Sequence, residues 1–236
     1  MHKSDLIDDP VNLKGSPFAT LIETKDDLAP TAWKEAEIES YKILGARTYS
    51  RTLNLFHTWP SGNSSEPKGE CVDFKNLKEQ GEGFHLGCNY DWTGEMFKHL
   101  YTNIPNSGID ASNWNPKKTS WRPDQMLVFD QSEFSEDYRN AGLLDRGQLF
   151  IPTSCHSDTC HLHIFFHSCH KPDLTLSYSD YPDIISYANS NKIVVLLPEA
   201  ETCWNTHTNT GAKKTSGLYE RHQSDKKWIT NKGRQP

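Results

Sequence analysis

LFIPTSCHSDTCHLHIFFHSCHK at residues 149–171 and YANSNKIVVLLPEAETCW at residues 187–204 are the most informative runs of this 236-residue chain. Within them, His161–Phe166 and Lys192–Leu197 are short, apolar and rich in Ile, Val, Leu and Phe. Such runs are typical of strands that are covered on both faces. They predict two neighbouring central strands of a parallel sheet.

The segment between these strands, Tyr178–Asn191, is long enough for a crossover helix. Pro182 stands where the first turn of a helix accepts proline. The side chains expected on the buried face of this helix are Ile184, Ile185, Tyr187 and Ala188. A strand, helix and strand in this order predict an α/β protein with a mostly parallel sheet.

Length and charge limit the possible functions. A chain of 236 residues suits one α/β domain with a sizeable core. The formal net charge of -6 argues against a nucleic acid or an anionic membrane as partner, because both favour basic surfaces. No apolar run approaches the roughly 18 residues of a membrane span. The first residues, MHKSDLIDDPVNLKG, lack the apolar region of a signal peptide, which predicts either an intracellular protein or a missing beginning.

A second strand, helix and strand precede this unit. Pro17–Glu23 predicts a short strand and Arg47–Phe56 another, with a helix over Thr31–Leu44 between them. Gly45 is placed where a helix ends. The residues expected on one apolar face of the helix are Trp33, Ala36, Tyr41, Ile43 and Leu44. A carboxylate-containing turn therefore follows the first strand, and His57 follows the second.

The rest of the chain contains fewer apolar runs. Residues 61–87 predict a long surface excursion, and a helix is expected to end near Tyr101. The polar tail predicts only a weak helix around Ala212–His222. We expect one domain over residues 1–236, whose parts are 17–58 with the Asp and His strands, 59–124 with loops and one helix, 125–205 with the strand unit described first, and 206–236 as a polar tail.

Several short motifs resemble the extracellular poly(3-hydroxybutyrate) depolymerase family. CHLHIFFHSC followed by IVVLLPEA and CW is similar to that family's two strands and Cys-Trp run. Matches to further family motifs occur in TKD at 24–26, HTWP at 57–60, CNYDWTGE at 88–95 and FDQSEF at 129–134. The resemblance covers most of residues 17–205 and has the order of a circularly permuted group. The chain departs from the family at Ser168, where the family has Gly, and after Trp204, where Asn205, Thr206 and His207 replace an aromatic run.

The resemblance implies an α/β-hydrolase-like fold and hydrolysis of carboxylic esters without a cofactor or metal. It assigns His57 as general base and Asp26 as the carboxylate that orients it, with Asp27 as the fallback if the register shifts by one. The backbone N–H of Cys169 would contribute to the oxyanion hole. The substrate would be a hydrophobic polyester or a small ester, with Trp59 and Trp204 as candidate binding residues.

Each of these residues also has an ordinary structural interpretation. His57 is also compatible with a surface histidine, and Asp26 with a helix cap or a solvated turn. Trp59 and Trp204 are compatible with core or rim positions. The sequence contains no signal for an oligomeric state.

Six cysteines leave many disulfide pairings open. The resemblance favours three pairs: Cys71 with Cys88, Cys155 with Cys160, and Cys169 with Cys203. Disulfides form in oxidising compartments, so this pairing and the family both imply an extracellular protein.

The nucleophilic serine of an α/β-hydrolase lies in a Gly-x-Ser-x-Gly turn, and the chain contains no such motif. The nearest match, Gly62-Asn63-Ser64, lies in the loop after His57. In the permuted relatives the nucleophile comes well before the Asp motif, which here would precede Met1. We therefore expect either a truncated sequence or an inactive relative, such as a secreted binding module, and almost no esterase activity from the chain as written.

Zinc binding is the alternative from another class. Cysteines and histidines are crowded into one short stretch: Cys155, His156, Cys160, His161, His163, His167, Cys169 and His170. The Cys-x₄-Cys spacing is wider than in most zinc knuckles, and histidines along a strand are spread too far to converge on one ion. The sequence therefore favours the esterase interpretation.

Overall fold

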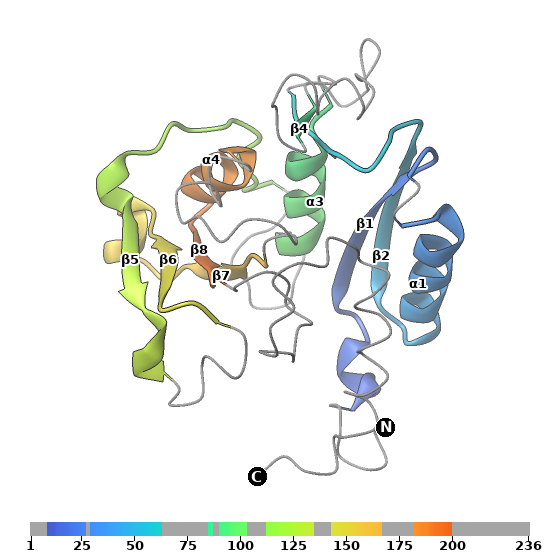
Figure 1. Cartoon of the computed structure of the whole chain (residues 1–236), viewed down its shortest axis with the longest axis horizontal. Coiled ribbons are helices and arrows are strands. Elements are labelled where there is room, and N and C mark those ends of the chain that lie inside the picture. Colours follow the sequence, from blue (N-terminus) through green and yellow to red (C-terminus); the bar gives the residue numbers. More distant parts are fainter. Residues whose placement is uncertain are drawn as a thin grey trace, which may run out of the picture. The chain divides into compact units, whose positions relative to one another are not determined.

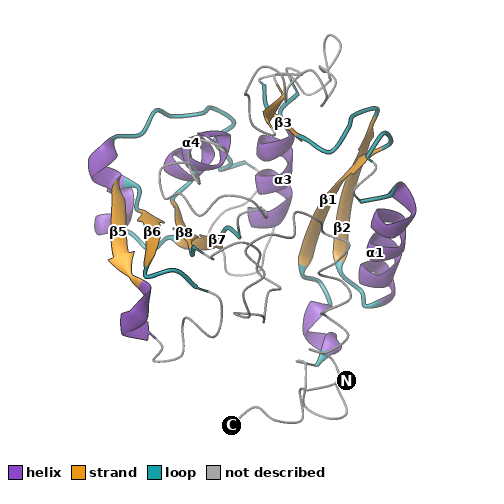
Figure 2. Cartoon of the chain, in the orientation of Figure 1, coloured by secondary structure: helices purple, strands orange, loops and turns teal. Residues whose placement is uncertain are grey.

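The computed structural model describes residues 9–26, 29–62, 85–86, 90–102, 112–134, 143–166 and 182–199. Its helices and strands belong to two compact units (Figures 1 and 2). The first unit contains the chain up to Thr119 together with Asp180–Asn191, and the second contains Ser120–Ser179 and the chain from Lys192 onward. The single domain expected over residues 1–236 stays a prediction.

Two parallel strands form the framework of the first unit. β1 (Pro17–Glu23) and β2 (Arg47–Leu53) pair along their whole length, so that Glu23 lies opposite Leu53. α1 (Thr31–Ile43) connects them, and the short 3₁₀ helix η2 (Pro10–Leu13) precedes β1. The predicted strand, helix and strand are confirmed. β2 is shorter than predicted, and the residues after Leu53 lead directly to His57.

The face that α1 buries differs from the prediction. Ile38 is the buried residue of this helix, whereas Trp33 and Ile43, both expected on the buried face, are 62% and 76% exposed. Tyr41 stacks on Phe18 of β1 with ring centroids 3.9 Å apart. The physical reason is that α1 packs on only two described strands, β1 and β2. Their surface is narrow, so it covers only a narrow stripe of the helix.

α3 (Trp92–Tyr101) lies on the other side of β1 from α1 (Figure 1) and contacts β1. It follows the short parallel pair β3 (Trp59–Pro60) and β4 (His85–Leu86). Its N-cap is Asp91, whose carboxylate accepts the N–H of Gly94 at 3.1 Å. A side chain at Gly94 would place its Cβ 2.2 Å from an oxygen of Asp91, so a larger residue there would displace the capping carboxylate. The buried residues of α3 are Trp92, Thr93, Gly94, Met96, Phe97 and Tyr101.

α4 (Pro182–Ser190) completes the first unit and packs against α3. It begins at the proline, as predicted. The four side chains expected on its buried face are all almost completely buried: Ile184, Ile185, Tyr187 and Ala188. Tyr187 also stacks on Trp114, with ring centroids 5.9 Å apart, and donates its hydroxyl to Asp91. The predicted helix is therefore confirmed, with bounds inside the expected range.

The second unit contains one four-stranded sheet in the order β5 (Met126–Asp130), β6 (Arg146–Phe150), β8 (Ile193–Leu197), β7 (His161–Ile164). β7 and β8 are parallel neighbours, which confirms the pairing that the sequence predicted. β6 is antiparallel to both β5 and β8, so the sheet is mixed. The most deeply buried apolar residues of this unit are Phe150, Ile193, Val195 and Leu197.

β7 corrects one expectation about the sheet. The strand is at the edge of the described sheet, and Leu162 and Ile164 are 55% and 45% exposed. The prediction that both strands are covered on both faces is therefore wrong for β7. In β8 the alternate residues Ile193, Val195 and Leu197 are buried and the two residues between them are partly exposed, so one face is fully covered and the other only in part. Short apolar composition alone does not distinguish an edge strand from a central one.

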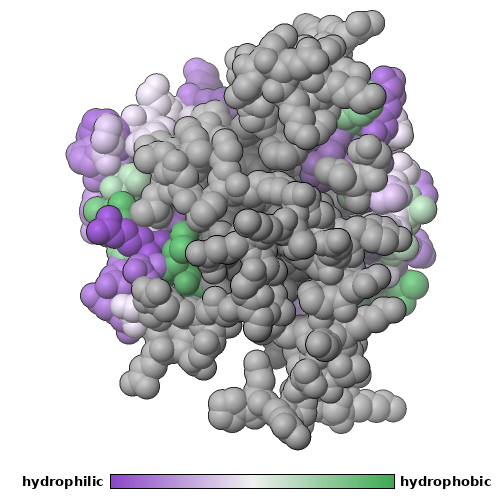
Figure 3. Space-filling view, in the orientation of Figure 1, coloured by the Kyte–Doolittle hydropathy of each residue, from purple (hydrophilic) through white to green (hydrophobic). Residues whose placement is uncertain are grey.

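Short 3₁₀ helices flank the strands of the second unit: η3 (Pro123–Gln125), η4 (Gln131–Phe134) and η5 (Thr153–His156). Cys155 in η5 forms a disulfide with Cys160, which directly precedes β7. This predicted disulfide is therefore present. On the face shown in Figure 3, the coloured surface alternates between hydrophilic areas and smaller apolar ones. None of the helices in the described part of the chain combines the length and the apolar character that a membrane-spanning helix needs.

Candidate active site

The turn after β1 and the segment after β2 lie against each other because the two strands end in register. The backbone N–H of Thr24 donates to the carbonyl of Leu53 at 2.9 Å, and that of Lys25 donates to Leu55 at the same distance. The parallel pairing thus continues for two more residues beyond the strands. It delivers Asp26 from the first segment and His57 from the second to the same place.

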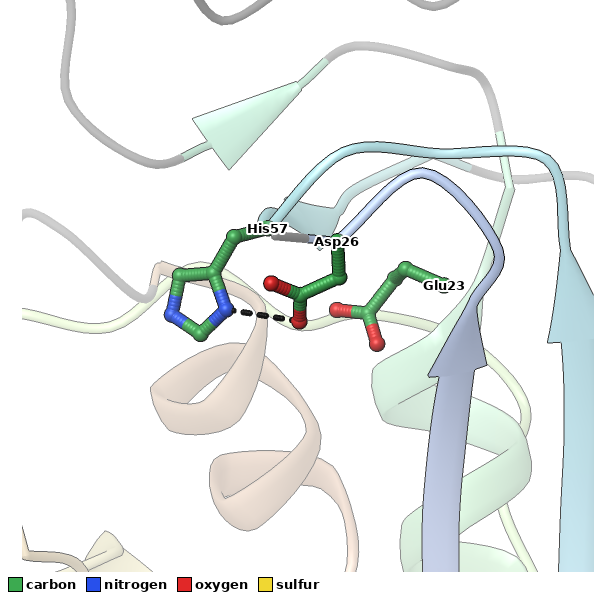
Figure 4. Close-up of side chains that lie close together, drawn as sticks. All are labelled: Glu23, Asp26 and His57. Carbon is green, nitrogen blue, oxygen red and sulfur yellow. Dashed lines mark hydrogen bonds and ion pairs between the residues drawn. The ribbon is translucent and has the colours of Figure 1, made fainter. Parts of the chain in front are cut away.

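Asp26 and His57 form a hydrogen-bonded pair at this edge of the sheet (Figure 4). Nδ1 of His57 lies 2.9 Å from Oδ2 of Asp26. The Asp26 side chain is fully buried, whereas the His57 side chain is 41% exposed. A buried carboxylate that binds Nδ1 fixes the tautomer and orientation of an imidazole, so that Nε2 on the opposite edge of the ring can accept a proton.

Lys34 of α1 binds the same carboxylate from the other side. Its Nζ lies 2.8 Å from Oδ2 of Asp26 and also donates to Glu23, the last residue of β1. The backbone N–H of Ala29 donates to the remaining oxygen of Asp26 at 3.0 Å. Asp26 therefore lies between His57 and the Glu23–Lys34 ion pair, and both of its oxygens accept hydrogen bonds.

The pKa values of these groups follow from burial and their partners. Burial raises the pKa of Asp26, but the hydrogen bonds from Lys34, His57 and Ala29 outweigh it and lower that pKa to about 2. For Glu23, burial dominates and raises the pKa despite the hydrogen bond from Lys34. Burial lowers the pKa of Lys34, but the bonds to Asp26 and Glu23 together raise it. Asp26 is thus ionised and Lys34 is charged over the neutral pH range.

The same residues do not form a convincing metal site. Glu23, Asp26 and His57 offer ligand atoms that all lie within 4.8 Å of one another. However, the ammonium group of Lys34 already binds both carboxylates, so a metal cation would have to displace it against charge repulsion. The zinc alternative also loses two ligands, because Cys155 and Cys160 are joined in a disulfide.

Trp59 is the other predicted site residue that the structure describes. Its indole N–H donates to Oγ1 of Thr93 in α3 at 2.9 Å, and the side chain is half-buried. Its role in binding substrate stays a prediction. The remaining predicted site and disulfide residues lie outside the described part of the chain: Asp27, Cys71, Cys88, Cys169, Cys203 and Trp204.

Glu23 and Lys34 were not predicted as site residues. The sequence does contain one signal for Lys34, because a cation in the first turns of a helix is disfavoured by the helix dipole unless a carboxylate binds it. Lys34 is the fourth residue of α1, and its side chain is only 13% exposed. A lysine so placed, next to a strand that ends in Glu, indicates a buried ion pair.

Comparison with known proteins gives a consistent result. A poly(3-hydroxybutyrate) depolymerase from Delftia acidovorans is 28% identical over 218 residues, which correspond to 84% of this chain and 39% of the relative. The solved structure of a PHB depolymerase from Penicillium funiculosum has a TM-score of 0.56 at 20% identity. A PHB depolymerase solved in complex with an R3HB trimer has a TM-score of 0.58 at 19% identity. No protein-family model matches the chain.

The two structural matches each cover 82% of this chain and 57% of the solved protein. The chain therefore spans well under two thirds of the length of these relatives. The likeness confirms the predicted α/β-hydrolase-like fold class, and the sequence match supports the predicted resemblance to the depolymerase family.

Proposed function

We propose that this chain is an ester hydrolase of the poly(3-hydroxybutyrate) depolymerase type, in which His57 is the general base and Asp26 orients it. The observation that carries the proposal is the 2.9 Å hydrogen bond between a fully buried carboxylate and a partly exposed imidazole. In such enzymes the carboxylate holds the imidazole in the tautomer that accepts a proton from the nucleophile. The similarity to poly(3-hydroxybutyrate) depolymerases supplies the substrate class, a polyester of a short hydroxy acid.

The reaction proceeds through an acyl-enzyme. A serine hydroxyl attacks the ester carbonyl while Nε2 of His57 takes its proton, and the imidazolium then gives this proton to the departing alcohol. Water then attacks the acyl-enzyme. His57 takes a proton from this water and gives it to the serine oxygen as the acid product leaves. Asp26 stays ionised throughout, because its pKa of about 2 lies far below the neutral pH range. The backbone N–H of Cys169 is our candidate donor to the oxyanion.

The serine is the component that the chain does not identify, since none of its residues lies in a Gly-x-Ser-x-Gly motif. Loss of the nucleophile costs a serine hydrolase on the order of 10⁶ in kcat. We therefore expect the chain alone to release almost no 3-hydroxybutyrate from polyester granules. Complementation with the segment of the Delftia acidovorans relative that the alignment does not cover should restore release.

The decisive measurement is the effect of His57 on that restored activity. His57→Ala and Asp26→Asn should each lower kcat by about 10⁴ or more, because the imidazole is absent or held in the wrong tautomer. His156→Ala is the matched control, since His156 is an exposed histidine in η5 of the second unit. A complemented protein that keeps its activity without His57 would contradict the proposal.

A binding module without catalysis is the second candidate, favoured by the absence of a Gly-x-Ser-x-Gly motif from the sequence. The two functions differ in one observation. A binding module would sediment with polyester granules and would release no soluble product even after complementation. A depolymerase would do both.

We also propose that the protein is extracellular. The disulfide between Cys155 and Cys160 supports this, because disulfides persist mainly in oxidising compartments. Expression with and without export to an oxidising compartment, followed by a count of free thiols, tests this proposal. Protein folded with fully reduced cysteines would contradict it.

A further inference from the structure

We propose that Glu23 and Lys34 form a charge couple behind Asp26 that sets the proton affinity of His57. Both are positioning residues: Lys34 acts through the carboxylate of Asp26, and the carboxylate of Glu23 binds Lys34 and also lies within 4.8 Å of a His57 ring nitrogen, so that its charge acts on the ring through space as well. The inference rests on the proposed function in one respect: it takes His57 as the general base. The sequence motifs predict Asp26 and His57, and they do not include Glu23 or Lys34.

The geometry places the couple in direct contact with the pair. Oδ2 of Asp26 accepts from Nδ1 of His57 at 2.9 Å and from Nζ of Lys34 at 2.8 Å. One oxygen atom thus lies between an imidazole and an ammonium group. The second carboxylate, that of Glu23, binds the same ammonium group. The three side chains behind His57 are shielded from water, with exposures of 0% for Asp26, 7% for Glu23 and 13% for Lys34.

Charge counting gives the direction in which each residue acts. With both carboxylates ionised, one ammonium group faces two negative charges, and His57 experiences a net negative environment. Removal of the Lys34 charge would make this environment more negative and would favour the imidazolium. Removal of the Glu23 charge would make it neutral and would favour the uncharged imidazole. In a site of low solvent exposure such charges are only weakly screened.

This balance matters because a general base must be uncharged at the working pH. Without Lys34, two buried carboxylates would face His57 and would favour its imidazolium form, which has no lone pair for the proton of a serine. Lys34 offsets one of these charges and leaves in place the hydrogen bond that His57 donates to Asp26. The couple therefore retains the orienting effect of the carboxylate while limiting its effect on the proton affinity of the ring.

Other charged groups near the pair have different partners. Lys25, in the same turn as Asp26, has its Nζ over the ring of Phe56 at 5.3 Å from the centroid. On α1, Lys42 and Glu39 face solvent and lie 4.0 Å apart. Among the charged groups of β1 and α1, Lys34 binds Asp26 and Glu23 binds Lys34.

The test is a histidine titration by NMR on the chain as it exists, with the His57 signal identified by its absence from His57→Gln. We expect Lys34→Met to raise the pKa of His57 by about one unit and Glu23→Gln to lower it by a smaller amount. The matched controls are Lys42→Met and Glu39→Gln, which make the same chemical changes on the exposed face of α1. We expect them to leave the pKa of His57 unchanged.

The double variant Glu23→Gln with Lys34→Met protects the test against misfolding of a single variant. It removes one positive and one negative charge, so it keeps the net charge of the cluster and should return the pKa of His57 close to its original value. A merely structural role would instead make the double variant at least as perturbed as either single one. Shifts of the same sign in both single variants, or a double variant that is not restored, would overturn the proposal.

The titration uses neither substrate nor nucleophile, so its outcome is separate from that of the proposed function. If the shifts appear and no ester is hydrolysed after complementation, the couple stands and the ester hydrolase does not. If ester is hydrolysed and the pKa shifts are absent, the ester hydrolase stands and the charge couple does not.

Discussion

At the scale of single residues, Asp26 has the most constrained environment in the candidate site. Its side chain is fully buried, and its two oxygens accept hydrogen bonds from Lys34, His57 and the backbone of Ala29. A buried carboxylate is stable only when such donors compensate for its lost hydration. The consequence is a group whose pKa of about 2 keeps it ionised over the neutral pH range, as its proposed role as the orienting acid requires.

This environment makes acid stability depend on Asp26. Its folded-state pKa of about 2 is below the ordinary value of 3.8, so its contribution is present above about pH 4 and is lost as the pH falls toward 2. We expect Asp26→Asn to lower the free energy of unfolding by about 2 kcal/mol near neutral pH. The difference between the two proteins should shrink as the pH falls from about 4 to about 2.

Urea unfolding at a series of pH values measures this difference. Asp158→Asn is the matched control, because Asp158 is an exposed carboxylate that pairs with Lys192 and should change stability much less. The opposite pH dependence is expected of Glu23, whose raised pKa favours the folded state below about pH 4.5, with that contribution lost as the pH rises through the folded-state pKa. A difference between wild type and Asp26→Asn that grows toward low pH would contradict this account.

The two members of the Asp–His pair were predictable from the sequence, and the couple behind them was not. Asp26 and His57 follow predicted strands within recognisable short motifs, and parallel strands end at a common edge. Lys34, by contrast, binds carboxylates eight and eleven positions away. That contact depends on how α1 packs, and the exposure of Trp33 shows that the apolar pattern gave the wrong face for this helix.

At the scale of elements, the sequence was informative where length and apolar periodicity were strong. β1, α1, α4 and β8 occupy the predicted segments. β5 and β6 were not predicted: β5 is apolar but only five residues long, and the composition of β6 is mixed. In β6 the buried Gln148 interrupts the apolar run, and Gly147 lies so close to Phe129 that a Cβ would approach its ring to 2.7 Å. Tertiary packing, which the sequence pattern does not report, decides such strands.

A polar network fixes the end of the segment that carries His57. Nζ of Lys118 donates to the carbonyl of Gly62 at 2.6 Å and lies 2.8 Å from Asp183 at the start of α4. Ser61 donates its hydroxyl to the same carboxylate at 2.5 Å. These contacts join the segment to α4 within the first unit. They were not predictable, because Lys118 and Asp183 lie in regions expected as connector and helix surface.

The disulfide gives a prediction at this scale. Replacement of Cys155 and Cys160 by Ser should lower the stability of the second unit by about 2 kcal/mol, because the bond closes a short loop before β7. Thermal unfolding followed by circular dichroism measures the effect. Thr159→Ser, an exposed change inside the same loop, should leave the transition in place. A double-serine variant as stable as the wild type would show that β7 does not depend on this bond.

At the scale of the whole molecule, charge limits how the protein approaches its proposed substrate. The net charge is -6, and a poly(3-hydroxybutyrate) surface is neutral. Adhesion to it must therefore depend on apolar contact, which salt does not screen. We expect the fraction of protein that sediments with polyester granules to stay constant or rise between about 0.05 and about 0.5 M salt.

Anionic lipid vesicles are the control surface for this measurement. They repel a negatively charged protein, so little binding is expected at low salt. Granule adhesion that falls steeply with added salt would show that electrostatic attraction dominates and would remove the support for an apolar binding surface.

β1 and β2 end in register, so the contact between Asp26 and His57 depends on the number of residues in each strand. A strand advances by about 3.3 Å per residue. A codon gained or lost in either strand would therefore shift one partner by more than the length of the bond between Asp26 and His57, which is 2.9 Å. Point substitutions along these strands can be absorbed by repacking, whereas a frame-preserving insertion or deletion would separate Asp26 from His57 in a single step.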